Sequence, residues 1–215
     1  MDFTSINTNT QTKETQSSIS PAAAINLLKE GNIRFRKKRQ VGRNLLQQVE
    51  DTSKGQFPFA TVLSCIDSRV SSEIIFDQGI GDIFSARVAG NFVNVDILGS
   101  MEFACKLAGT KVIVVLGHTS CGAVKGACDN AELGNLTAML ANITPAVHAT
   151  KDPDDTSQRN SKNIPFVNAV AEKNVHLNIE RILKESPVLA EMKENGEIDI
   201  VGGMYNIHSG EVTFY

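Results

Sequence analysis

Hydrophobic residues in the middle of the chain cluster in short runs without polar alternation. Such runs occupy residues 59–65, 82–86 and 111–117. Strands that are covered on both faces have this pattern, whereas half-exposed strands alternate between apolar and polar residues. We therefore predict three buried β-strands. Two further strands are predicted near the end of the chain, at residues 198–205 and 211–214.

Segments with helical periodicity separate these runs, at residues 71–76, 96–107, 135–147 and 163–183. A further helix is predicted from Pro21 to about Arg36, because a serine followed by proline is a common helix start. Strands that alternate with helices indicate a parallel sheet with right-handed crossovers. The pattern thus predicts an α/β fold with a mostly parallel central β-sheet flanked by helices.

The chain has 215 residues, which suits one well-buried domain. Residues 4–20 are nearly all Ser, Thr, Asn and Gln and offer little to bury. We expect residues 1–20 to form a disordered or loosely docked N-terminal arm, either a plain flexible tail or a functional segment. Residues 21–215 are expected to form a single domain.

Composition excludes several classes of function. Lys and Arg number 21 against 24 Asp and Glu, so no basic field favours nucleic acid. No apolar run approaches the roughly 20 residues that a membrane helix needs. Four cysteines are too few for a disulfide scaffold, and the N-terminus lacks the pattern of a signal peptide, so we expect a cytoplasmic protein. A basic cluster at residues 34–39 is either a phosphate contact or the solvated end of a helix.

Metal-type ligands follow two of the predicted buried strands. Cys65 closes the first apolar run, and His118 and Cys121 follow the third. Parallel strands bring their carboxyl ends to one edge of a sheet, so we expect these side chains to meet there. Two sulfur ligands and one nitrogen ligand suit Zn²⁺, although each residue taken alone could equally be a packing residue. Thr119 and Ser120 resemble a helix N-cap, which would place Cys121 in the first helical turn, where free N–H groups favour a thiolate.

Asp67 and Arg69 stand two and four residues after Cys65. Isolated charges in a loop that leaves a buried strand are costly, so we expect these two side chains to form an ion pair. Three Cys or His ligands leave the fourth zinc position open, as catalytic zinc sites require.

At these residues the chain resembles the β-class carbonic anhydrases. The matching segments are CIDSRV from Cys65, RVAGN from Arg87, GSMEFA from Gly99 and GHTSCGA from Gly117. The resemblance implies reversible hydration of CO₂ to bicarbonate. It implies zinc bound by Cys65, His118 and Cys121, the catalytic pair Asp67 and Arg69, and N-terminal helices that pack on a partner subunit of a homodimer or homotetramer.

Three further residues match the plant-type subgroup of that family. Gln56 corresponds to a glutamine that donates to a substrate oxygen, and Phe84 and Phe103 correspond to residues of the CO₂ pocket. Together with Ala89 they are expected to form the substrate site. The bicarbonate-inhibited bacterial subgroup has a tryptophan where Val62 stands, and this chain contains no tryptophan.

Two roles are expected for Asp67. As an acceptor it would orient the nucleophilic water, with Arg69 keeping the carboxylate ionised. Released from Arg69, it could instead become the fourth zinc ligand and stop the reaction.

Two other functions stay open at this point. The same ligand set would serve hydrolysis of carbonyl sulfide or carbon disulfide, and a closed four-ligand site would serve a non-catalytic zinc-stabilised interaction module.

Cys105 and Cys128 are expected to be packing residues. His148, His176 and His208 are either solvated histidines or proton shuttles.

Overall fold

Five strands form one sheet at the centre of the molecule. The computed structural model describes residues 9–215. The strands are β1 (Ala60–Ser64), β2 (Ile83–Arg87), β3 (Val112–His118), β4 (Asp199–Tyr205) and β5 (Val212–Phe214). Their order is β2-β1-β3-β4-β5; the first four pair in parallel, and β5 pairs with β4 antiparallel. The predicted mostly parallel α/β fold is confirmed.

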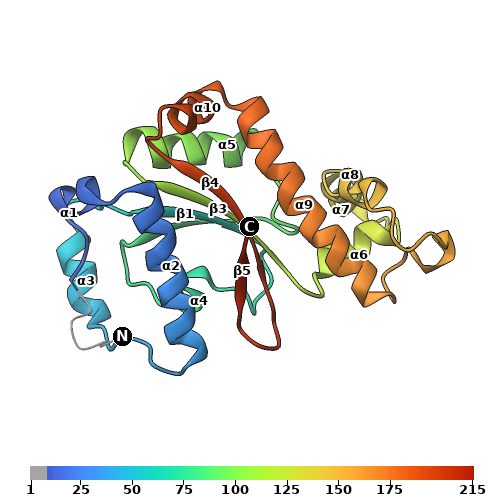
Figure 1. Ribbon diagram of the computed structural model, residues 1–215, viewed down its shortest axis with the longest axis horizontal. Coiled ribbons are helices and arrows are strands. Elements are labelled where there is room, and N and C mark those ends of the chain that lie inside the picture. The colour runs from blue at the N-terminus through green and yellow to red at the C-terminus, as the bar shows by residue number, and fades with distance from the viewer. Residues whose placement is uncertain (1–8) are drawn as a thin grey trace.

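Helices lie on both sides of this sheet, which passes between α2 and α9 (Figure 1). The α-helices are α1 (Lys13–Ser18), α2 (Pro21–Arg36), α3 (Leu45–Thr52), α4 (Ser72–Ile75), α5 (Val95–Glu102), α6 (Gly122–Cys128), α7 (Gly134–Leu140), α8 (Thr144–Ala149), α9 (Ile164–Glu185) and α10 (Pro187–Glu194). A π-helix, η1 (Phe103–Leu107), continues α5, and a short 3-10 helix, η2 (Thr156–Gln158), precedes α9.

The two faces of the sheet carry separate hydrophobic clusters. Successive side chains of a strand point to opposite faces. Val62 and Val114 accordingly pack in one cluster with residues of α2 and α4, whereas Leu63 and Val115 pack in another with residues of α5, α9 and α10. All positions of β1 and β3 are buried, which explains why these strands appear in the sequence as unbroken apolar runs.

Some predicted helix boundaries were wrong. The helix predicted at residues 135–147 is two helices, α7 and α8, and Pro145 stands in the first turn of α8, where proline is tolerated. The helix predicted at 96–107 ends in the π-helical turn η1. Helices α3 and α10 were not predicted; each has only eight residues, so its apolar face spans little more than two turns.

Part of the expected N-terminal arm is a helix attached to the domain. Thr12 and Thr15 form a reciprocal capping box at the start of α1. Gln16 is buried, and its amide donates to the carbonyl oxygens of Pro58 (2.6 Å) and Ala108 (2.8 Å). The segment from residue 9 to residue 20 is therefore docked through a polar side chain, which an apolar pattern cannot reveal. Residues 1–8 of the expected arm lie outside the described residues.

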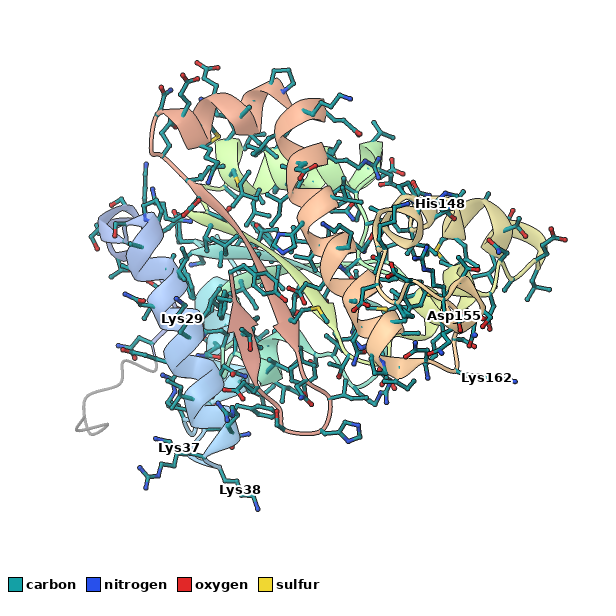
Figure 2. All side chains as sticks on the ribbon, turned by 45° about the vertical axis from the view of Figure 1, so that its right-hand side comes forward. Lys29, Lys37, Lys38, His148, Asp155 and Lys162 are labelled. Atoms are coloured by element: carbon teal, nitrogen blue, oxygen red, sulfur yellow. The ribbon has the colours of Figure 1, made fainter. Side chains whose placement is uncertain are left out.

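The basic cluster at the end of α2 divides into two parts. Arg34 is buried and forms an ion pair with Asp77, and Arg36 pairs with Glu211 at 2.7 Å. Lys37 and Lys38 extend from the end of the helix (Figure 2). This arrangement fits a solvated helix end with two structural arginines. No helix within residues 9–215 is long and apolar enough to cross a membrane.

Candidate metal centre

Three buried side chains converge where β1 and β3 end. Cys65 directly follows β1, His118 is the last residue of β3, and Cys121 directly precedes α6. Their ligand atoms all lie within 4.8 Å of one another, and the two sulfur atoms are 3.9 Å apart. In the described part of the chain, this is the one group of three or more His, Cys, Asp or Glu side chains with such spacing. The predicted convergence of the two strand ends is thus present.

The turn between β3 and α6 sets the position of Cys121. The backbone N–H of Thr119 donates to the carbonyl of Tyr205, and that of Ser120 donates to the side chain of Asn168. Ser120 adopts a left-handed backbone conformation (φ 56°), which reverses the chain toward the helix. Cys121 is itself the N-cap residue, so the prediction that it lies in the first helical turn was wrong by one position. Its thiol still faces free N–H groups of that turn, which help to stabilise a thiolate.

His118 is oriented as a metal ligand. Its Nδ1 lies 3.0 Å from the carbonyl oxygen of Thr119, which suits an Nδ1–H donor. Its Nε2 is buried and has no hydrogen-bond partner among the described residues. A hydrogen bond at one ring nitrogen commonly fixes the other as a metal ligand. A cation beside Nε2 would satisfy this buried atom.

The two thiols lie in contact, and each affects the pKa of the other. The contact with Cys121 lowers the pKa of Cys65 to about 4, against the opposing effect of burial. The same contact, together with burial, raises the pKa of Cys121, because a second negative charge beside the first is unfavourable. A divalent cation would allow both thiolates to exist, and two sulfur ligands with one nitrogen ligand match the preference of Zn²⁺.

Asp67 and Arg69 form the predicted ion pair at the edge of this group. Arg69 donates from Nε to Oδ1 (2.9 Å) and from Nη2 to Oδ2 (2.7 Å) of Asp67. The Arg69 side chain therefore holds the pKa of the Asp67 carboxyl well below its usual range. Oδ2 of Asp67 is 4.0 Å from Nε2 of His118. The carboxylate thus lies beside the three ligands while both of its oxygens are bound by Arg69.

Arg87 holds the loop that carries Cys65 and Asp67. It is the last residue of β2, and it donates from Nε to the carbonyl of Cys65 (3.0 Å) and from Nη2 to the carbonyl of Asp67 (2.8 Å). The sequence places Arg87 in the matching segment RVAGN, but its contacts with this loop were not predicted. Arg87 ends β2, a strand that pairs with β1, and this position indicates a side chain at the same edge of the sheet as Cys65.

The residues expected at the substrate are divided between two places. Phe84 and Phe103 pack edge to face with ring centroids 6.3 Å apart, and both line a cavity of about 620 Å³. None of the three potential metal ligands is among the lining residues of that cavity. Gln56 is exposed in the segment before β1, whereas Ala89 is adjacent to Gly90, whose N–H donates to Cys65. Within one chain, Ala89 is near the metal centre, and the two phenylalanines form a separate group.

The remaining cysteines and histidines lie outside the ligand group. Burial raises the pKa of Cys105 and of Cys128 to about 11, as expected of packing thiols. His148 and His208 are exposed, the former on α8 (Figure 2), and His176 stacks on Tyr215.

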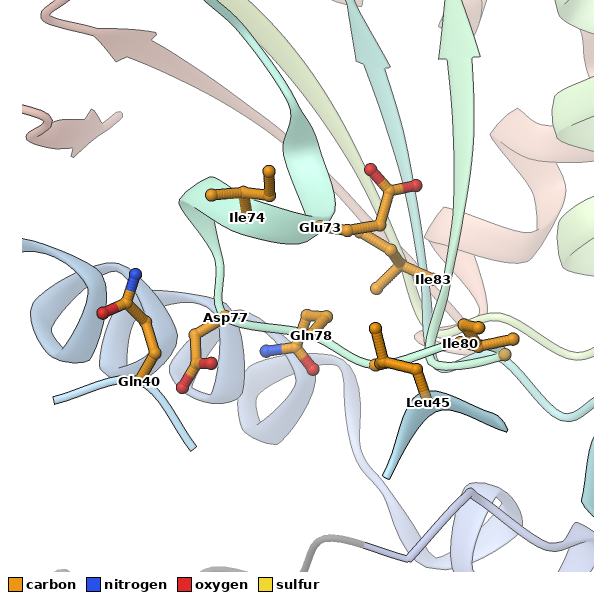
Figure 3. A pocket seen from close by; sticks show the side chains of 10 residues that line it. Gln40, Leu45, Glu73, Ile74, Asp77, Gln78, Ile80 and Ile83 are labelled. Atoms are coloured by element: carbon orange, nitrogen blue, oxygen red, sulfur yellow. The ribbon is translucent and has the colours of Figure 1, made fainter. Parts of the chain in front are cut away.

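Another cavity, of about 500 Å³, lies at the opposite end of the sheet, where β2 begins (Figure 3). Ile83, the first residue of β2, contributes to its lining together with residues of α4 and the following loop. The lining carboxylate of Asp77 is bound by Arg34 and by Arg43. The charge of Asp77 is therefore neutralised, and the second lining carboxylate, Glu73, accepts a hydrogen bond from the hydroxyl of Ser85 at 2.6 Å.

Comparisons with known proteins place the chain among carbonic anhydrases. The family described as carbonic anhydrase matches residues 60–212. Carbonic anhydrase 2 of Mycobacterium tuberculosis is 34% identical over 199 residues, which cover 90% of this chain and 92% of the relative. The solved structure of the β-carbonic anhydrase CcaA is similar with a TM-score of 0.70 and 26% identity, over 89% of this chain and 94% of its own.

A further similar structure belongs to one of two tetrameric β-carbonic anhydrases of the filamentous ascomycete Sordaria macrospora. It has a TM-score of 0.69 and 22% identity, over 78% of this chain and 89% of its own. At this level of identity the likeness concerns the fold.

Proposed function

The chain belongs to the β-class carbonic anhydrases, enzymes that hydrate CO₂ to bicarbonate, and we propose that its catalysis depends on a zinc ion held by Cys65, His118 and Cys121. The observation that carries this proposal is the group of two buried thiols and one buried, unpartnered Nε2 atom. When bound, zinc lowers the pKa of a water molecule and so supplies a nucleophile for CO₂ near neutral pH.

Asp67 is the group that accepts a hydrogen bond from the nucleophilic water in this proposal. Its carboxylate lies beside the ligands and is ionised, because Arg69 donates to both oxygens. An ionised acceptor at a fixed position would orient a lone pair of the water toward CO₂. In this arrangement Asp67 is an acceptor. Its second expected role, as a fourth ligand, requires that Arg69 release it.

We also propose that a partner subunit completes the substrate site. Cys65 follows the end of β1, whereas Gln56 precedes its start by four residues. A five-residue strand spans about 15 Å, so Gln56 and its own metal centre lie at opposite ends of the strand. Gln56, Phe84 and Phe103 can fulfil their expected roles if they act beside the metal centre of another copy.

Exposed apolar side chains support a homo-oligomer, either a dimer or a tetramer. Leu46 on α3 is 82% exposed, and Val95 and Leu107 at the two ends of α5–η1 are 80% and 77% exposed. Side chains of this size and exposure leave apolar surface that a partner subunit could cover. The Sordaria macrospora proteins of this fold are tetrameric.

Mixed oligomers test the shared site. A Gln56→Ala chain and a Cys121→Ser chain would each be impaired alone. If Gln56 acts on the metal centre of its partner, an oligomer of the two chains regains a site with intact zinc ligands and an intact glutamine. Activity in the mixture no higher than the mean of the two separate variants would contradict the proposal.

Metal analysis and CO₂-hydration kinetics of the purified protein test the zinc proposal. We expect close to one zinc per chain, with activity lost on chelation and regained with added Zn²⁺. Full activity of a metal-depleted protein would contradict it.

The relatives are named carbonic anhydrases, which favours CO₂ over carbonyl sulfide or carbon disulfide and favours an enzyme over a non-catalytic module.

Two finer assignments complete the proposal. Membership of the plant-type subgroup is supported by Gln56 and by valine at position 62. A cytoplasmic location is supported by the cysteines, all four of which are free thiols.

A further inference from the structure

We propose that Asn174 on α9 is a positioning residue for the metal centre: it sets the hydrogen bond from the Gly90 N–H to the sulfur of Cys65 and thereby tunes this ligand. The inference rests on the proposed zinc site and names a residue that does not itself touch the metal or the substrate.

The contact to be positioned is a backbone hydrogen bond to a ligand atom. The N–H of Gly90 donates to Sγ of Cys65 at 3.3 Å, and both residues are buried. Gly90 has a φ of 82°, and a side chain at this position would collide with Ile143. Glycine is therefore required for the loop to bring its N–H to the sulfur.

Two amides on α9 hold this loop from the other side. The Nδ2 of Asn174 donates to the carbonyl of Gly90 at 2.8 Å. One helical turn later, Oδ1 of Asn178 accepts from the N–H of Val93 at 2.7 Å. Asn178 also donates to the side chain of Asn174 at 3.1 Å, so the two amides form one connected network. The network fixes both ends of the segment from Gly90 to Val93.

The setting of these amides indicates that their role lies in this loop. Asn174 and Asn178 are each 1% exposed, on a helix whose other buried residues include Val170, Val175 and Ile182. A buried amide is unfavourable unless it is hydrogen-bonded, and apolar side chains would pack there without that requirement. Helix α9 packs on β3 and β4, so it provides a rigid support for the loop (Figure 1).

The expected consequence is electronic. An N–H donor withdraws charge from a thiolate, and partners of the ligands tune a metal in this way. Without the donor, the sulfur of Cys65 is a stronger electron donor, and the metal becomes a weaker Lewis acid.

Cobalt(II) substitution measures this effect, because the sulfur-to-cobalt charge-transfer band reports the donor strength of the thiolates. In the Asn174→Leu and Asn174→Ser variants, we expect this band to move to longer wavelength. In the zinc forms we expect kcat for CO₂ hydration to fall about tenfold with KM unchanged.

Asn32→Leu is the matched control. Asn32 is also buried and donates to two backbone carbonyls, those of Ile75 and Gly210. The N–H groups of these two residues donate to the carbonyls of Ser71 and Asn206, whereas the N–H of Gly90 donates to a ligand atom. We expect this variant to lose thermal stability and keep the cobalt band of the wild type.

An unchanged band in a folded, cobalt-loaded Asn174 variant would overturn this inference and leave the proposed zinc site standing. So would a band shift in Asn32→Leu of the same size, or failure of both Asn174 variants to fold while Asn32→Leu folds. Absence of a sulfur-to-cobalt band in the wild type would overturn the proposed zinc site, and the inference with it.

Discussion

Oδ2 of Asp67 lies 4.0 Å from Nε2 of His118, while both carboxylate oxygens of Asp67 accept hydrogen bonds from Arg69. This relationship separates the two roles that Asp67 can have. The ion pair with Arg69 is two-pronged, which makes its geometry specific. The arrangement therefore favours Asp67 as a hydrogen-bond acceptor beside the metal.

Asp67→Asn tests that role. The variant keeps the three metal ligands but loses the negative acceptor, so we expect unchanged zinc content and a kcat for CO₂ hydration that is roughly 100-fold lower. Stopped-flow kinetics and metal analysis measure both quantities. Asp129→Asn is the control, because Asp129 is an exposed acid that accepts from the N–H of Ser161. Wild-type kinetics for Asp67→Asn would refute the role.

Cys121→Ser tests the metal ligand set. A hydroxyl is a poor ligand for Zn²⁺ compared with a thiolate, so we expect the variant to lose most of its zinc and its activity together. Cys128→Ser is the matched control at the other end of α6, and there we expect full zinc content. Stoichiometric zinc in purified Cys121→Ser would remove Cys121 from the ligand set.

The sequence allowed prediction of the metal centre because its ligands stand at strand ends. Cys65 and His118 end two buried apolar runs, and the parallel pairing of β1 with β3 necessarily brings such ends together. The role of Gln16 was not predictable in this way. Its partners are backbone carbonyls of residues 58 and 108, and no side-chain pattern encodes such a contact. Arg87 also donates to backbone carbonyls, and only its position at the end of a strand pointed to the site.

Gln56→Ala tests the substrate site. Loss of one donor to a polarised substrate oxygen is expected to lower kcat/KM by a factor that corresponds to about 1 to 3 kcal/mol, without loss of zinc. Gln47→Ala is the control, because Gln47 is an exposed glutamine on α3 that donates to Asp51. If kcat/KM is the same in both variants and the wild type, Gln56 does not contact the substrate.

Asp82→Asn tests a pH dependence of stability. Burial raises the pKa of the Asp82 carboxyl, although its Oδ2 accepts from the N–H of Gly79 at 2.7 Å. A carboxyl whose pKa is raised in the folded state stabilises the fold at low pH, and this contribution is lost as the pH rises through the folded pKa. Asparagine keeps an acceptor and carries no charge. We therefore expect the stability of the variant relative to wild type, measured as the difference in the free energy of unfolding, to be greater at pH 7 than at pH 4.

Asp155→Asn is the control, because we expect its stability to depend on pH in the opposite direction. Hydrogen bonds from Ser157 lower the pKa of Asp155, so its charge stabilises the fold above the unfolded pKa. Asp155→Asn should accordingly lose more stability at pH 7 than at pH 4. Urea unfolding at both pH values measures the two differences. If the relative stability of both variants changes in the same direction between pH 4 and pH 7, the buried charge of Asp82 does not destabilise the fold.

Bicarbonate is expected to act as a simple product inhibitor. Cooperative inhibition is implied for relatives with tryptophan at position 62, where an indole N–H is available. Here Val62 is fully buried within β1 and packs in the cluster with α2 and α4, so it offers no donor to an anion. Arg87, a further donor at the end of β2, is engaged with the carbonyls of Cys65 and Asp67. Initial rates of CO₂ hydration at fixed pH should therefore fall hyperbolically with added bicarbonate, and a sigmoidal curve would contradict the plant-type assignment without affecting the enzyme class.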